Sequence, residues 1–157
     1  MKILLFILLF LCYVPLSAQS TEQTEDTLWI EPFLASLKIV LSNAEQVDFV
    51  LLEPKYANEV YDLPNGVYLD SSLSEIDNYV TKDRRVYYVC LTSFKIDSWG
   101  AQIEWQNVSA SYRENTSQIY YTTHVNYSFI YHYDGTSWSR GPTAIQNINH
   151  SHQSKSK

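Results

Sequence analysis

The sequence predicts an α+β fold in which N-terminal helices pack on a long, curved antiparallel sheet of about four to six strands. Between residues 32 and 80, apolar side chains recur at helical spacing, interrupted by two short apolar runs. From residue 86 to 148 they alternate with period two, which predicts a β-meander. The longest alternation, at 119–133, would extend about 50 Å as a strand, so this strand has to bend.

The N-terminal segment is typical of a secretory signal peptide. Its apolar run at residues 3–14 is too short to span a bilayer as a helix, and small residues follow it. Cleavage after Ala18, or after Ser20, leaves no membrane span, and the MK start and SAQ end favour a bacterial protein that is secreted or periplasmic. The expected divisions are a signal peptide (1–18, alternatively 1–20), a flexible acidic leader (19–28), a single α+β domain (29–148) and a disordered tail (149–157).

Charge and cysteine usage restrict the classes of partner and the source of stability. The formal net charge is −6, and the only basic cluster is Lys82, Arg84 and Arg85. An acidic chain repels phosphate, so we do not expect nucleic acid as a partner. Signal cleavage leaves Cys90 as the single thiol. One thiol cannot form an internal disulfide, so hydrophobic burial has to stabilise the domain.

Three helices are expected ahead of the meander. Pro32 suits a first helical turn, and the apolar spacing after it predicts a helix that ends at Asn43. A short second helix begins at Pro54, and Ser72 with Glu75 has capping-box spacing ahead of a third. Brief strands are expected between these helices at residues 47–52 and 67–69.

The second meander strand, from residue 99 to 112, changes phase. Its apolar residues are odd-numbered up to Trp105 and even-numbered from Val108. One inserted residue at Gln106 or Asn107 would return both halves to a single face, so we predict a β-bulge there. The register that follows pairs Ala110 with Ile119, Ile103 with Val125, Ala101 with Tyr127 and Trp99 with Phe129.

The last hairpin is predicted from the Asp-Gly dipeptide at residues 134–135. A two-residue loop there places Trp138 opposite Tyr131. The final strand is interrupted by Gly-Pro at 141–142 and resumes at 143–148. Because proline cannot donate a ladder hydrogen bond, this strand is expected at the edge of the sheet.

This order of elements, ending in YHYDGTSWSR, resembles the NTF2-like, or more broadly cystatin-like, α+β roll over residues 32–148. The resemblance implies a curved sheet that wraps a long helix and leaves a cone-shaped pocket. Enzymes of this family usually place an acid or a histidine inside the cone, but His124 and His132 lie in the outward phase here. Asp48 or Asp97 could reach the cavity from elsewhere. The family includes enzymes, ligand binders and scaffolds, so it implies no particular activity.

Aromatic side chains dominate the face that is predicted to turn inward, in a chain with 13 Tyr and 4 Trp. Rings with hydroxyl tips are typical walls of a ligand pocket. Aromatic residues also suit strands and fill small cores, so a filled core and an open pocket both remain as interpretations. The candidate ligand-binding residues are Tyr121, Tyr127, Tyr131, Trp99, Trp105 and Trp138.

We find no residue set that predicts catalysis, a metal site or a cofactor. Cys90 lies in a dense apolar run with no base nearby in sequence, which favours a packing role. His124 and His132 are too far apart to share a metal, and His150 with His152 supplies only two ligands. Asn-x-Ser sequons occur at Asn107, Asn115, Asn126 and Asn149 and would be used only in a eukaryotic secretory pathway.

The sequence therefore favours an exported, non-catalytic binding domain. Its Tyr- and Trp-rich concave face would hold a small apolar ligand, or the sheet edge would bind a protein partner, and a homodimer through the sheet is compatible with both. One alternative is a hydrolase- or isomerase-type enzyme of the NTF2-like family. Another is a secreted carbohydrate-binding or adhesion β domain, which requires a planar set of rings facing water.

Overall fold

The structure, a computed structural model, describes residues 28–60 and 62–153, with side chains up to residue 148. The predicted signal peptide and residues 19–27 of the predicted leader lie outside the described residues. The elements in chain order are α2 (Ile30–Asn43), β1 (Phe49–Leu51), α3 (Pro54–Ala57), β2 (Tyr68–Asp70), α4 (Leu73–Asp77), β3 (Val86–Ile96), β4 (Gly100–Arg113), β5 (Gln118–Tyr133) and β6 (Trp138–Gln153).

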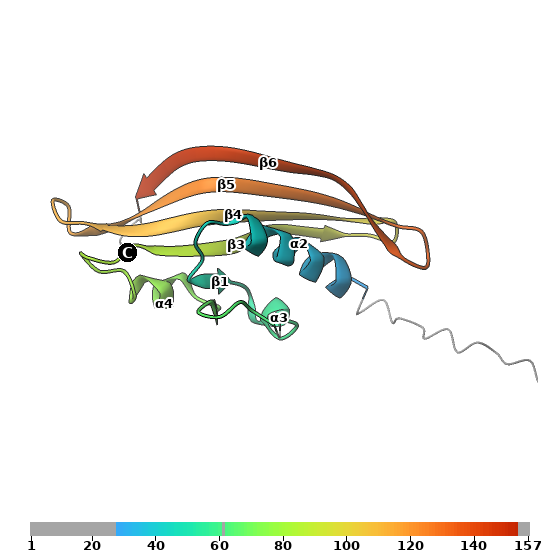
Figure 1. The fold of residues 1–157 in the computed structure, drawn as a ribbon, viewed down its shortest axis with the longest axis horizontal. Coiled ribbons are helices and arrows are strands. Elements are labelled where there is room, and N and C mark those ends of the chain that lie inside the picture. Colours follow the sequence, from blue (N-terminus) through green and yellow to red (C-terminus); the bar gives the residue numbers. More distant parts are fainter. Residues whose placement is uncertain (1–27, 61, 154–157) are drawn as a thin grey trace, which may run out of the picture.

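The predicted α+β class is confirmed, with one six-stranded sheet in the order β2-β1-β3-β4-β5-β6. Strands β3 to β6 form the antiparallel meander, and they run side by side and bend along their length (Figure 1). The short strand β1 instead pairs in parallel with both β2 and β3, so the sheet is mixed at one edge. In the described part of the chain, no helix combines the length and apolar character needed to cross a membrane.

The three helices begin where the sequence predicts, but only α2 is long, with 14 residues. At α4 the predicted capping box is wrong, because the Ser72 side chain makes no cap hydrogen bond to the helix. Its hydroxyl lies 2.6 Å from that of Ser74, and the Ser72 N–H donates to the Asp70 carboxylate at 3.1 Å. Asp70 thus accepts the backbone donor that Glu75 would accept in a capping box.

The sheet is apolar on both faces, which corrects the prediction of a single buried face. One face, which we call the α2 face, packs Val89, Trp105 and Phe129 against α2. The opposite α4 face packs Tyr88 and Val108 in a second apolar cluster with α4. Neighbouring residues such as Tyr88 and Val89 belong to different clusters because side chains alternate between the faces of a strand. The apolar residues of β4 change phase because the first half of the strand packs on the α2 face and the second half packs on the α4 face.

The inserted residue predicted in β4 lies instead in β5. Val108 pairs with Thr123 and Asn107 pairs with Val125, so His124 is the extra residue. The predicted register is also wrong, because the β4–β5 loop spans residues 114–117 and the bulge then adds a residue to β5: the observed pairs include Ala110 with Tyr121, Tyr112 with Ile119, Ile103 with Phe129 and Ala101 with Tyr131. Strand β4 needs no insertion, because its two apolar halves pack on opposite faces of the sheet.

The loop of the last hairpin spans residues 134–137, so the predicted two-residue loop is wrong and Trp138 pairs with Tyr133. The Asp134 carboxylate accepts the N–H groups of Thr136 and Ser137 at 2.8 Å each. These hydrogen bonds lower the pKa of Asp134 to about 2, and they favour the longer loop. Strand β6 is an edge strand as predicted, irregular near residues 141–142, and it runs past the expected end at residue 148 to Gln153.

The core under α2 is a cluster of aromatic rings around Phe33. Trp105 and Tyr56 both lie 5.5 Å from the Phe33 ring between centroids, and Trp29 lies 5.6 Å from it. The Trp105 indole N–H donates to the Ser36 hydroxyl at 2.9 Å, and that hydroxyl donates to the Phe33 carbonyl at 2.7 Å. The buried polar atoms of this pair are therefore satisfied, as burial requires.

Candidate functional site

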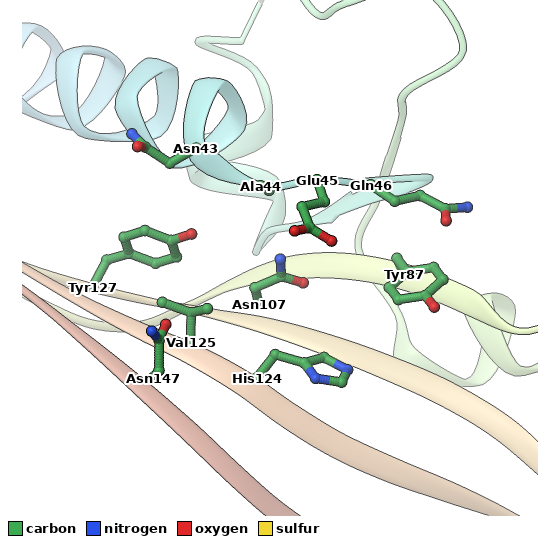
Figure 2. A pocket seen from close by; sticks show the side chains of 10 residues that line it. All are labelled: Asn43, Ala44, Glu45, Gln46, Tyr87, Asn107, His124, Val125, Tyr127 and Asn147. Carbon is green, nitrogen blue, oxygen red and sulfur yellow. The ribbon is translucent and has the colours of Figure 1, made fainter.

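A pocket lies beyond the C-terminal end of α2, between residues 43–46 and the α2 face of strands β3 to β6 (Figure 2). Its volume is about 730 Å³. We call it the Asn107 pocket, and its lining residues are Asn43, Ala44, Glu45, Gln46, Tyr87, Asn107, His124, Val125, Tyr127 and Asn147. Its lining is mainly polar, in contrast to the aromatic core beside it.

The end of α2 builds the upper wall of this pocket. The Asn43 side-chain amide and the Ser42 hydroxyl both donate to the Ile39 carbonyl, at 2.8 and 2.9 Å. These side chains bond back onto the last turn of α2 and so fix their own positions at the end of the helix. The chain leaves the helix in an extended conformation at Ala44, and Glu45 and the residue after it form an exposed rim.

His124 points into the pocket, although its phase in the sequence predicted an outward position. As the inserted residue of the bulge, it lies on the α2 face together with the next residue, Val125. Its Nε2 atom lies 2.8 Å from the Ser109 hydroxyl, and its ring lies 6.3 Å from that of Tyr87. His132 stands on the other face, so the two histidines do not share a surface as the alternation predicted.

Asn107 lies in the floor of the pocket and is only 7% exposed. Its side-chain oxygen Oδ1 is buried and has no hydrogen-bond partner among the described residues. Leaving a buried acceptor unpaired costs about 1–3 kcal/mol, so such an atom in a native fold calls for an explanation. The oxygen is closed to solvent and the amide nitrogen faces the pocket (Figure 2), so a donor on a bound molecule would satisfy the oxygen after a half-turn of the Asn107 amide.

The six aromatic residues predicted to bind a ligand do not form one site. Of them, only Tyr127 lines the Asn107 pocket. Trp105 is fully buried beneath α2, and Tyr121 lies on the α4 face, where its hydroxyl donates to Asp77 at 2.6 Å. Trp99 is 77% exposed beside the turn between β3 and β4. Most of these six residues therefore belong to the packed core of the domain.

The remaining two candidates, Tyr131 and Trp138, line a smaller pocket of about 270 Å³ between α2 and strands β5 and β6. The Trp138 indole N–H donates to the Leu28 carbonyl at 2.9 Å. Burial raises the pKa of Tyr131, an effect that the nearby Arg140 opposes. This small pocket shares no lining residue with the Asn107 pocket, so the predicted aromatic residues do not line one common pocket.

The acids that could have reached the cavity are held elsewhere. Asp48 accepts the Tyr87 N–H at 2.8 Å, and Asp97 accepts the N–H groups of Trp99 and Gly100 at the β3–β4 turn. Within the described ranges, no group of three or more His, Cys, Asp or Glu residues is placed to hold a metal ion. The acid that lines the Asn107 pocket is Glu45, which the sequence pattern did not indicate.

Cys90 is partly buried beside the apolar cluster of the α4 face, and burial raises its pKa to about 11. Because the thiolate is the reactive form, we expect Cys90 to react with iodoacetamide far more slowly at neutral pH in the native protein than in urea. The rate should reach half its maximum near pH 11. A midpoint near the ordinary thiol pKa of about 8.5 would contradict this environment.

Comparison of this chain with protein-family models, with characterised proteins and with solved structures gives no match.

Proposed function

We propose that this protein is an exported binding domain that holds a small polar ligand in the Asn107 pocket. The observation that carries the proposal is the Oδ1 atom of Asn107 in the floor of this pocket, which is buried and has no hydrogen-bond partner among the described residues. Ligand sites combine a concave shape with a few convergent polar groups. Here His124 and Tyr127 converge on the same space from strand β5.

The pocket supports a polar ligand in place of the apolar ligand expected from the aromatic face. Trp105 and Phe129, which would have walled an apolar cavity, are fully buried against α2. Their apolar surface is already used for packing, so it is not available to a ligand. The space that remains lies past the helix end, where amide and imidazole groups line it.

A protein partner along the edge strand has weaker support. Strand β6 is the long edge of the sheet, but Pro142 and two register irregularities interrupt it. Features of this kind protect edges from pairing with another chain. We therefore place the proposed binding activity in the pocket, and a homodimer through the sheet stays a prediction.

A hydrolase- or isomerase-type enzyme is the second candidate, favoured by the hydrogen bond between His124 and Ser109. A histidine in a pocket is a suitable general base. Ser109 is only 2% exposed and does not line the pocket, which disfavours its use as a nucleophile. Recovery of a chemically changed ligand after incubation with the wild type, but not with His124→Phe, would support the enzyme over the binder.

Two further expectations belong with this proposal. We infer that the fold is a divergent NTF2-like or cystatin-like roll, supported by a long first helix, α2, that covers one face of a bent meander with a pocket beside it. The second apolar cluster, on the α4 face, is not part of that resemblance. The leader of the sequence supports export to the periplasm or the medium.

The test is a screen of small polar molecules (sugars, polyols, amino acids and amines) by two-dimensional NMR with the mature protein. Binders should shift the side-chain signals of Asn107 and His124. In Asn107→Leu their affinity should fall at least about fivefold, because the buried acceptor is lost, while the fold should be no less stable. Dissociation constants from the titrations and urea unfolding of the same variant measure the two effects.

Asn126→Leu is the matched control. Asn126, in β5, resembles Asn107 of β4 in that its side-chain oxygen is buried and has no hydrogen-bond partner among the described residues. Its position in the strand, however, places it on the α4 face. Binding should survive in Asn126→Leu. If both variants bind equally well, or if binders shift only signals of the α4 face, the Asn107 pocket is not the site.

A further inference from the structure

The charge of the lining residues narrows the class of ligand. Of the ten described residues that line the Asn107 pocket, Glu45 is an acid and none is a lysine or arginine. Glu45 points from the loop after α2 toward Asn107, across the space that a ligand would occupy (Figure 2). The whole chain carries a formal charge of −6. Both the local and the net charge attract a cation and repel an anion.

We infer that the ligand of the Asn107 pocket is a small organic cation with a protonated amine, an inference that rests on the proposed binding function. An ammonium group has three hydrogen-bond donors and no acceptor. It would pair its charge with the Glu45 carboxylate, and it would donate to the Asn107 Oδ1 atom after a half-turn of the amide, whose nitrogen faces Glu45 in Figure 2. One group of the ligand thus satisfies both features of the pocket.

Aromatic rings at two walls support the same class. Tyr87 from β3 and Tyr127 from β5 line the pocket on opposite sides of Asn107 (Figure 2). The face of a tyrosine ring attracts ammonium groups through its electron-rich π-system. Burial raises the pKa of Tyr127, so its hydroxyl stays neutral and adds no negative charge at neutral pH. The carboxylate of Glu45 thus remains the anionic partner.

An anionic or a neutral ligand would make fewer favourable interactions with the residues that line the pocket. A carboxylate ligand would meet Glu45 with no lysine or arginine among the described lining residues to offset the repulsion. His124 is the remaining basic group there, and its Nε2 atom already contacts the Ser109 hydroxyl. A neutral polyol could donate to Asn107 but would leave the charge of Glu45 unpaired.

Three probes of similar size separate these classes: ethanolamine, ethylene glycol and glycolate, which are cationic, neutral and anionic at neutral pH. Each is titrated at millimolar concentrations into the mature protein while the Asn107 and His124 side-chain signals are followed by NMR. Ethanolamine should bind most tightly. In Glu45→Gln its affinity should fall about fivefold, the upper end for an exposed ion pair, and added salt should weaken wild-type binding.

Glu104→Gln is the matched control, because it removes an equal charge from the opposite face, where Glu104 accepts a hydrogen bond from Gln102. Ethanolamine affinity should be unchanged in this variant. Equal binding of ethylene glycol, or full affinity in Glu45→Gln, would overturn the inference of a cation. Such results would leave the proposed pocket standing, provided that binding still depends on Asn107. Absence of any shift with ethanolamine would also overturn the inference.

Discussion

Deletion of Gln106 should unfold the domain, whereas deletion of His124 in the neighbouring strand should leave it folded. Strand β4 alternates without an inserted residue, so removing Gln106 turns one half of it over. If Val108 keeps its place, Ile103 and Trp105 leave the α2 face, which costs about 3–6 kcal/mol of burial. That loss is comparable with the whole stability of a domain, about 5–15 kcal/mol.

His124, in contrast, is the unpaired residue of a bulge. Its removal joins Thr123 to Val125, and the pairs with Val108 and Asn107 then follow each other in regular register. Near-UV circular dichroism and urea unfolding of both deletion variants measure the difference. The His124 deletion should keep a cooperative transition but lose ligand binding. A stable Gln106 deletion together with an unfolded His124 deletion would place the inserted residue in β4 instead.

Trp105→Ala should destabilise the domain by about 3–5 kcal/mol. The Trp105 side chain is fully buried, packs on Phe33 with ring centroids 5.5 Å apart and donates its N–H to Ser36. Truncation would leave a cavity between α2 and the sheet and would remove the hydrogen bond that joins these two layers. The change is measured as a shift of the urea midpoint at constant slope.

Trp99→Ala is the matched control for this substitution. The Trp99 side chain is 77% exposed, so its truncation should change stability by no more than about 0.5 kcal/mol. Trp105→Phe should fall between the two, because it keeps most of the apolar volume but loses the donor to Ser36. Similar effects of Trp99→Ala and Trp105→Ala would contradict the assignment of Trp105 to the packed core.

Much of the fold could be predicted because local patterns decide it. The spacing of Phe33, Leu37 and Val40 predicted α2, and the alternation in 119–133 predicted β5. The interruption at residues 141–142 and the edge position of β6 also followed from local chemistry. The strand registers did not follow from local chemistry. The longer loop at Asp134, for example, shifts the pairing of β5 with β6 by two residues.

The candidate site was harder to predict than the fold. Asn107 entered the sequence pattern as part of a bulge or a sequon, and His124 entered as a solvent-facing residue. The sequence signal shared by Asn107 and His124 is the change of phase near residue 107. The structure explains this change by apolar clusters on both faces of the sheet and by a bulge in β5. Glu45 gave no local signal, because its role depends on where the end of α2 meets the sheet.

The sequence alone therefore determined which segments form helices and strands and which side chains are candidates for burial. Tertiary structure decided which face each half of β4 and β5 presents, and hence that Tyr127 and Tyr121 serve different clusters. The physical reason is that period two divides a strand into two sets of side chains but does not say which set a helix covers. That choice is made by contacts between residues far apart in the chain, such as Ser36 with Trp105.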